Sequence, residues 1–227
     1  MKLIITRPEE DCGVLAQVLR GRGHDVIIAP LIKITPRAHV EVPDLPYQAV
    51  CLTSANAARH LPASVSRRAS AFTPGAQSAV AAMAAGFGHV EAKGGNVEGM
   101  AAHIKLCLKP ERGPILYVSG SETSGDLAGT LKADGFNVVK VVAYDAVAQA
   151  LPMNAALLAS CDGALLYSQR TAKIWVAEME RLGLFPRLSH FCLSKQVADA
   201  LPEKWRIRVA QEPTESAILG LIDLAAK

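Results

Sequence analysis

The sequence of 227 residues repeats itself at an interval close to half its length, and this duplication restricts the fold more than any other feature. Four segments of the first half reappear in the second half in the same order. The interval drifts by a few residues along the chain, as loop insertions would cause. The repeat therefore predicts two copies of one architecture. The matched positions are residues 3–6 with 116–119, Gly13 with Gly125, Ser54 with Ser168, and Glu98 with Glu215.

Each copy contains short apolar runs that lack the polar alternation of a half-exposed strand. Such runs are typical of strands buried on both faces, as in a parallel sheet that is covered by helices. With helices between the strands and right-handed crossovers, the pattern predicts an α/β fold with one parallel sheet in each domain. The runs are residues 3–5, 26–28, 49–52, 115–118, 138–142 and 164–166.

The first helix is expected over residues 8–22. Pro8 suits the first helical position, and three acidic side chains at residues 9–11 favour the positive end of the helix dipole. Gly21 and Gly23 are expected to end the helix, because glycine adopts the left-handed conformation that closes many helices.

Two stretches that follow the second strand of each copy, residues 29–36 and 143–148, are predicted to be extended linkers between domains. If the chain crosses at both, one domain is split and combines residues 1–36 with 148–227. The other domain, residues 37–147, is then inserted into it. The residues alone also permit two sequential halves.

Charge and hydropathy exclude several classes of partner. The formal net charge is +3 and the basic residues are dispersed, which does not indicate a nucleic-acid partner. No run approaches the roughly 20 apolar residues of a membrane span. The apolar run at residues 3–5 is too short for a signal peptide, so we expect a cytoplasmic protein. No coiled-coil heptad is present, so we expect a monomer.

Metal sites and disulfides are not predicted. The five cysteines are scattered without a Cys-x-x-Cys pair, and four lie in apolar segments, which indicates buried thiols in a reducing compartment. The six histidines lack the spacing of metal ligands. Phosphate-loop, dinucleotide-binding and hydrolase-elbow motifs are also absent, which disfavours a nucleotide-dependent enzyme. The cysteines are Cys12, Cys51, Cys107, Cys161 and Cys192.

Hydroxyl-bearing residues follow several predicted strands, directly before a helix. Ser54 follows one strand, Ser168 follows its repeat partner, and Ser78 lies in a third turn of this kind. Ligands of open parallel sheets collect at the carboxyl ends of the strands, where helix N-termini favour carboxylates or phosphates. Serine and threonine are also common at such positions because they are preferred helix N-caps. Both interpretations stay open.

Tyr144 lies in a predicted linker, where a phenol could face a cleft between the domains. Packing against the neighbouring domain would explain the same position. The sequence does not decide between these two roles.

An ordered set of short motifs resembles the uroporphyrinogen-III synthase family over nearly the whole chain. The resemblance implies two flavodoxin-like domains that are joined by a two-stranded linker. It also implies a lyase that closes linear hydroxymethylbilane into uroporphyrinogen III, inverting ring D and losing water without a cofactor. A transient contact with the upstream deaminase is left open. The motifs are residues 6–8, 53–57, 75–79, 125–127, 142–144 and 212–214.

The resemblance assigns roles to particular residues. Tyr144 matches the linker tyrosine that is proposed to assist departure of the hydroxyl group, and a phenol of ordinary pKa is protonated at neutral pH. The eight carboxylates of the substrate need N–H donors and cations, while the enzyme mainly holds one geometry. The residues expected to bind the substrate are Thr6, Arg7, Ser54, Asn56, Ser78, Ser168 and Lys195.

The chain departs from the family pattern at several positions. Val197 stands where a threonine is common, Ser194 replaces a glycine, and Ser119 occupies a position that is often arginine. Ser78 keeps the hydroxyl of the usual threonine, and Lys195 is expected to supply a cation at the same edge. These departures leave an alternative: a non-catalytic two-lobed binding module of the same fold.

Overall fold

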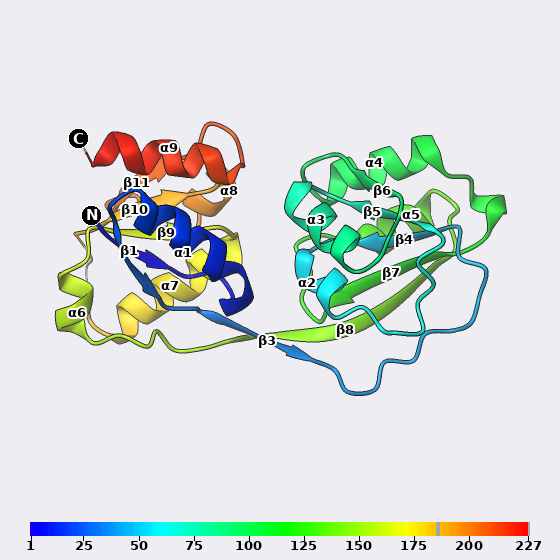
Figure 1. The fold of residues 1–227 in the computed structure, drawn as a ribbon, viewed down its shortest axis with the longest axis horizontal. Coiled ribbons are helices and arrows are strands. Elements are labelled where there is room, and N and C mark those ends of the chain that lie inside the picture. The colour runs from blue at the N-terminus through cyan, green and yellow to red at the C-terminus, as the bar shows by residue number, and fades with distance from the viewer. Residues whose placement is uncertain (185–186, 227) are drawn as a thin grey trace. The chain divides into compact units, whose positions relative to one another are not determined.

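The computed structural model describes residues 1–184 and 187–226, and the chain divides into two compact units (Figure 1). Unit 1 combines Met1–Lys33 with Val147–Lys227, the two ends of the chain. Unit 2 is the middle of the chain, Ile34–Ala146. Each unit is an α/β layer structure with its own sheet.

The sheet of unit 1 has the strand order β11-β10-β9-β1-β2, and all its described pairs are parallel. Numbered along the chain within this unit, the order is 2-1-3-4-5, which is the flavodoxin-like order. The strands are β1 (Lys2–Ile5), β2 (Asp25–Ile28), β9 (Gly163–Leu166), β10 (Ser189–Cys192) and β11 (Arg206–Val209).

Alternation along β1 distributes its side chains to both faces of the sheet, as predicted for a doubly covered strand. Leu3 and Ile5 pack with α1 (Cys12–Gly21) and α9 (Glu215–Ala225) on one face. Ile4 packs with α7 (Gln169–Arg181) on the other. The shorter helices of unit 1 are α6 (Ala155–Ala159), α8 (Lys195–Ala198) and the 3-10 helix η1 (Glu9–Asp11).

The sheet of unit 2 has the order β3-β8-β7-β4-β5-β6. The pairs from β8 to β6 are parallel. Helices α4 and α5 share a core cluster with one face of this sheet, while α2 and α3 contact β7 and β5. The strands are β3 (Ile32–Pro36), β4 (Ala49–Leu52), β5 (Ser70–Thr73), β6 (Val90–Ala92), β7 (Ile115–Gly120) and β8 (Val138–Ala148). The helices are α2 (Ala55–Arg59), α3 (Ala76–Ala84), α4 (Val97–Cys107), α5 (Leu127–Ala133) and the 3-10 helix η2 (Pro110–Arg112).

The two units repeat one topology with exchanged parts. The sequence repeat pairs β1 with β7 and β9 with β4, and each of these pairs occupies the same place in its sheet. In unit 1, β1 and β2 come from the first copy of the repeat and β9, β10 and β11 from the second. In unit 2, the equivalent strands β7 and β8 come from the second copy, and β4, β5 and β6 from the first. This exchange splits unit 1 and makes unit 2 a circular permutation of it.

The chain passes between the units through two neighbouring strands, β3 and β8. The N–H of Gln149 donates to the Leu31 carbonyl at 3.0 Å, and that of Arg37 donates to the Ala143 carbonyl at 2.9 Å. Residue numbers rise along one strand while they fall along the other, so the two strands are antiparallel. Arg37 also donates two hydrogen bonds to the Asp145 carboxylate, at 2.8 and 3.0 Å. The predicted two-stranded linker is confirmed.

Two local expectations were wrong. The run at residues 26–28 is not buried on both faces, because β2 is an edge strand and Ile28 is 38% exposed. Pro8 does not begin the first helix, since its backbone is extended and a 3-10 turn precedes α1. Gly23 follows the helix with a φ of +80°, as expected for a closing glycine.

The predicted burial of four cysteines is confirmed: Cys12, Cys51, Cys161 and Cys192 are buried, and Cys107 is exposed. Burial raises the pKa of the Cys12 thiol to about 11 and that of Cys192 to about 12. These thiols are therefore protonated at neutral pH. Among the described helices, none is long and apolar enough to cross a membrane.

Candidate functional site

Each sheet has one pair of neighbouring strands where the order along the sheet reverses, β1 with β9 in unit 1 and β7 with β4 in unit 2. In open α/β sheets, ligands bind outside the carboxyl ends of the strands at such a point. Most of the residues predicted from the sequence to bind substrate follow the carboxyl ends of strands in these sheets. The structure brings Thr6, Arg7 and Ser168 together in unit 1, and Ser54 and Tyr144 in unit 2.

Thr6 is fully buried at the end of β1. Its hydroxyl donates a hydrogen bond of 2.7 Å to the carbonyl of Leu165 on β9. This bond ties the carboxyl ends of the two strands together, so the observed role of Thr6 is structural. Substrate binding by its side chain stays a prediction.

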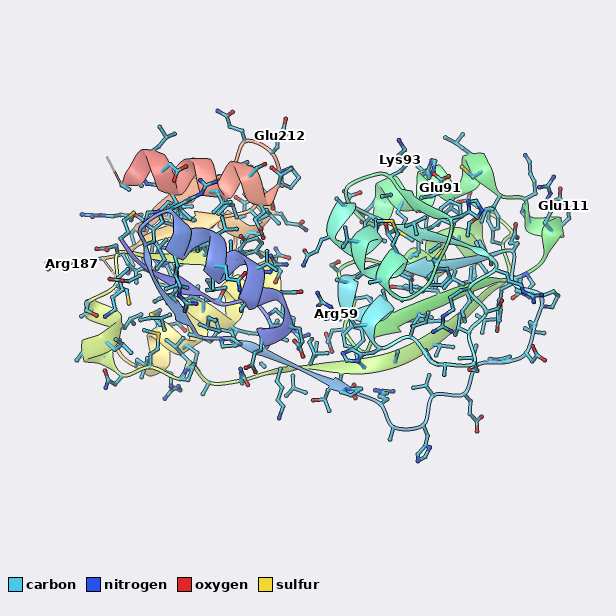
Figure 2. All side chains as sticks on the ribbon, in the orientation of Figure 1. Arg59, Glu91, Lys93, Glu111, Arg187 and Glu212 are labelled. Atoms are coloured by element: carbon cyan, nitrogen blue, oxygen red, sulfur yellow. The ribbon has the colours of Figure 1, made fainter. Side chains whose placement is uncertain are left out.

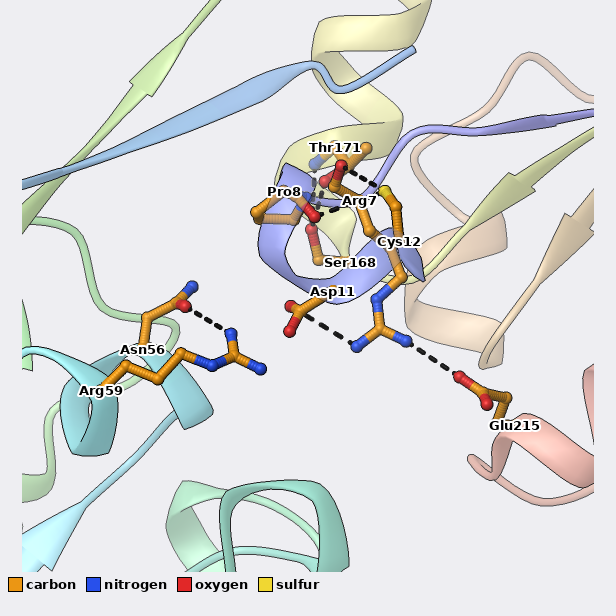
Figure 3. A network of polar contacts seen from close by, with 9 residues as sticks. All are labelled: Arg7, Pro8, Asp11, Cys12, Asn56, Arg59, Ser168, Thr171 and Glu215. Carbon is orange, nitrogen blue, oxygen red and sulfur yellow. Dashed lines mark hydrogen bonds and ion pairs between the residues drawn. The ribbon is translucent and has the colours of Figure 1, made fainter. Parts of the chain in front are cut away.

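Arg7 is a buried cation between two carboxylates (Figure 3). Its guanidinium lies 3.0 Å from Glu215 and 3.5 Å from Asp11, and it stacks on the Tyr167 ring with 4.4 Å to the centroid. Burial raises the pKa of Tyr167, and the Glu215 carboxylate raises it further while Arg7 opposes both. The phenol is therefore neutral near Arg7. A substrate carboxylate would have to exchange with Glu215, which is 40% exposed, to reach this cation.

Both repeat-related serines are helix N-caps. The Ser54 oxygen accepts a hydrogen bond from the Ala57 N–H at 3.0 Å and begins α2. The Ser168 oxygen accepts from the Thr171 N–H at 3.0 Å and begins α7. The N-cap alternative is confirmed for both residues, and a hydroxyl that caps a helix can still reach a ligand with its own hydrogen.

Tyr144 of β8 lies against the carboxyl ends of β7 and β4. Its hydroxyl is hydrogen-bonded to the Ser54 hydroxyl at 2.8 Å, and its side chain is 6% exposed. The ring covers Gly120 at the end of β7, where a Cβ would lie 2.7 Å from Tyr144 Cε2. The His60 ring lies 5.8 Å away, centroid to centroid. The absence of a side chain at residue 120 therefore makes room for the phenol.

The remaining predicted residues occupy different settings. Asn56 is buried in α2 and accepts a hydrogen bond of 2.8 Å from Arg59. Ser78 is buried in the first turn of α3. Lys195 begins α8, where its side chain is 83% exposed and forms an ion pair of 2.6 Å with Asp199. These three side chains therefore lie on three different helices, and the bonds of Asn56 and Lys195 join neighbours within one helical turn.

The departures from the family pattern have structural roles. Val197 is a buried member of the apolar core of unit 1. Ser194 is at the N-cap position of α8, although its side chain accepts no capping hydrogen bond within the described chain. Ser119 is fully buried, and its hydroxyl donates to the Gly120 carbonyl at 3.0 Å. Its side chain is thus turned into the protein rather than toward a ligand.

Sequence reasoning missed the partners of Arg7. Glu215 is 208 residues away along the chain. Tyr167, whose ring lies under the guanidinium, was not among the predicted residues. The one available signal was the repeat itself, which paired Glu215 with Glu98 but gave no reason for a contact with Arg7. Gly120 was not among the predicted residues either. Within the described residues, no group of three or more His, Cys, Asp or Glu side chains could hold a metal ion.

The fold and these sites define a class: α/β proteins built from two flavodoxin-like units, with polar side chains at the carboxyl edges of both sheets. Comparison with protein families narrows this class. The model of uroporphyrinogen-III synthase HemD matches residues 13–220. The chain therefore belongs to the uroporphyrinogen-III synthase family, whose members are cyclising lyases of tetrapyrrole biosynthesis. The resemblance and the enzyme class inferred from the sequence are confirmed.

Solved structures agree with the fold. The uroporphyrinogen-III synthetase of Helicobacter pylori 26695 matches with a TM-score of 0.68 at 15% identity, over 100% of this chain and 99% of that one. A mutant uroporphyrinogen III synthase from the extremely thermophilic bacterium Thermus thermophilus matches with a TM-score of 0.60 at 15% identity, over 100% of both chains. A search of curated protein sequences finds no match. The predicted fold class is confirmed.

Proposed function

We propose that this chain converts linear hydroxymethylbilane into uroporphyrinogen III, inverting ring D and releasing water, with Tyr144 as the proton donor. The hydrogen bond of 2.8 Å between the Tyr144 and Ser54 hydroxyls supports this proposal more than any other contact. A general acid has to be protonated and held in a fixed orientation, within hydrogen-bond reach of the group it serves. Packing on Gly120 and the hydrogen bond to Ser54 hold the phenol in a fixed orientation, which supports this role.

Either hydroxyl can be the donor in the bond between Ser54 and Tyr144. We propose that Ser54, whose oxygen accepts from the Ala57 N–H, donates its own hydrogen to the Tyr144 oxygen during the reaction. The phenolic hydrogen can then point to the hydroxyl group that leaves the substrate. As Tyr144 gives up its proton, the Ser54 hydrogen and the nearby helix N-terminus stabilise the negative oxygen.

The proton balance of the step is simple. The C–O bond of the terminal hydroxymethyl group breaks, the Tyr144 proton joins the departing oxygen, and water leaves. The electrophile that remains is attacked within the same molecule, through the azafulvene and spiro intermediates that the family resemblance implies. Ring closure releases one proton from the substrate, which restores the phenol. No cofactor is required by this balance.

Binding of the substrate carboxylates is proposed for the polar groups at the carboxyl edges of the sheets. Arg7 offers a guanidinium after exchange with Glu215, and Lys195 offers an exposed ammonium. The N-termini of α2 and α7 offer backbone N–H groups beside Ser54 and Ser168. Asn56, Ser78 and Thr6 complete the proposed set. We also propose that the chain acts as a cytoplasmic monomer, with no nucleic-acid partner and at most a transient contact with the deaminase.

A coupled assay tests the activity. Porphobilinogen and its deaminase generate hydroxymethylbilane in situ in the presence of this protein. The products are then oxidised to uroporphyrins, and the isomers are separated. Mainly isomer III is expected. If a folded sample yields only isomer I, the synthase proposal fails and the non-catalytic binding module takes its place.

A further inference from the structure

Unit 1 contains a cavity of about 360 Å³ at the amino-terminal ends of its strands. This is within the range of small-molecule sites, which measure roughly 300–1,000 Å³. Asp162 directly precedes β9, Leu188 directly precedes β10, and Arg206 is the first residue of β11, and all three line the cavity. None of the predicted substrate-binding residues lines it.

The position of the cavity separates it from the proposed substrate site. The strands β9, β10 and β11 are parallel, so their amino-terminal ends share one edge of the sheet. Thr6, Ser168 and Lys195 follow carboxyl ends, at the opposite edge. A strand of four residues spans about 13 Å, which is too far for one small ligand to contact both edges. Figure 2 labels Arg187 on the side of unit 1 where the N-terminus lies in Figure 1.

The floor of the cavity is apolar. Leu158 and Leu188 are buried members of the core of unit 1, and Leu184 packs against the same cluster. Ala155 and Ala159 of α6 line the cavity with small side chains, which leaves the space open. Such a floor favours the apolar body of a ligand, because burying that body removes it from water.

The rim carries charge. Arg187 and Arg206 are exposed, and their guanidinium groups form no hydrogen bond or ion pair within residues 1–184 and 187–226. The Asp162 carboxylate already accepts a hydrogen bond of 2.6 Å from the Lys2 N–H. The lining therefore has one net positive charge, which a single carboxylate balances better than a phosphate dianion does. Arginine also matches a carboxylate with two parallel N–H donors.

We propose that this cavity is a second binding site, for an organic acid with a compact apolar body and a single carboxylate. The apolar body lies on Leu158, Leu184 and Leu188, and the carboxylate accepts hydrogen bonds from Arg187 and Arg206. The proposal does not depend on the activity proposed above, because the two sites lie at opposite edges of the sheet.

The probe for this site is 4-phenylbutyrate, with 4-phenylbutanol as its uncharged counterpart. Both tryptophans of the chain, Trp175 and Trp205, lie in unit 1, and Trp205 directly precedes Arg206, so tryptophan fluorescence reports on the site. Ligand-observed NMR gives an independent affinity. Saturable binding of 4-phenylbutyrate is expected with a Kd of about 1 mM or tighter, as suits roughly a dozen heavy atoms. The alcohol should bind about tenfold more weakly.

Variants locate the binding. Arg187→Gln and Arg206→Gln should each weaken 4-phenylbutyrate binding about tenfold, while Arg208→Gln, two residues along the same strand and outside the lining, should not. Ala159→Phe should block the probe by filling the cavity. All four substituted residues are exposed, so melting curves should show that the variants stay folded. No saturable binding, equal binding of the alcohol, or unchanged affinity in a variant that combines both cavity arginine substitutions would overturn the proposal.

Discussion

The Ser54 hydroxyl lies 2.8 Å from the Tyr144 hydroxyl and 3.0 Å from the Ala57 N–H, so one oxygen both caps α2 and holds the phenol. Ser54 and Tyr144 are 90 residues apart in sequence. Their contact joins the end of a central strand to the strand that leads out of unit 2. It links the stability of a helix end to the orientation of the proposed acid.

Tyr144→Phe should reduce the formation of isomer III by about 10²–10⁴-fold, the usual contribution of general acid catalysis. The ring still packs on Gly120 and Ser54 keeps its cap, so thermal stability should change little. Tyr47→Phe is the control, because the Tyr47 hydroxyl donates to the Pro43 carbonyl of a loop. Equal rates for both variants in the coupled assay would remove Tyr144 from the proton-transfer step.

Ser54→Ala should lower both stability and activity. Loss of the cap costs about 1 kcal/mol in the free energy of unfolding, and loss of the hydroxyl leaves the Tyr144 oxygen without this partner. Asn154→Ala is the matched control, since Asn154 caps α6 by the same type of bond at 2.9 Å. Chemical denaturation should show similar losses for the two variants. Only Ser54→Ala should lower kcat, and an unchanged kcat would show that Ser54 serves only as a cap.

Gly120→Ala should displace the Tyr144 ring. The added Cβ would lie 2.7 Å from two ring carbons, so we expect a loss of about 1–3 kcal/mol in stability together with a fall in kcat. Gly21→Ala is the control, because a Cβ at the end of α1 meets nothing within 4 Å. That variant should be neutral or slightly stabilising. Full activity of Gly120→Ala would mean that the position of the ring is not critical.

Removing the Arg7 cation should lower the stability of unit 1 more than it lowers the rate of proton transfer. Arg7→Gln leaves the Asp11 and Glu215 carboxylates without this ion pair, so we expect a destabilisation of about 1–3 kcal/mol. If Arg7 binds a substrate carboxylate as proposed, KM should also rise while kcat changes less. A change in stability with an unaltered KM would give Arg7 a purely structural role.

His190 should make stability fall between neutral and mildly acidic pH. It is fully buried beside the rings of Trp205 and Trp175, and burial lowers its pKa to about 4. The unfolded chain takes up the proton near pH 6.5, whereas the folded chain resists it until about pH 4. The contribution of His190 to the free energy of unfolding is therefore fully present above pH 6.5. It declines as the pH falls toward 4, by about 3 kcal/mol in total.

Denaturation curves at several pH values measure this decline. His190→Phe keeps an aromatic ring between the two tryptophans and should flatten the pH dependence between pH 6.5 and 4. An equally steep decline in that variant would assign the effect to other groups, such as carboxylates.

Much of the fold could be predicted because its signals are local. The buried runs at residues 49–52 and 164–166 mark central strands, and the serines after them mark helix starts. The prediction that residues 26–28 are buried on both faces was wrong, because apolar content indicates a strand but not its place in the sheet. An edge strand has a neighbouring strand on one side only, whatever its composition, so its side chains are more exposed to solvent.

The duplication and the parallel sheets could be predicted from the sequence, because hydrophobic periodicity depends on residues a few positions apart. The same local spacing offered the helix caps as one of two interpretations. The three-dimensional structure was needed to show which copy supplies each strand and which side chains meet. Thr6 reaches Leu165 across 159 residues, and Arg7 reaches Glu215 across 208. Such contacts depend on the order of strands in a sheet and on how the helices pack against it. No local pattern encodes that order, because the hydrophobic effect that drives packing does not specify partners.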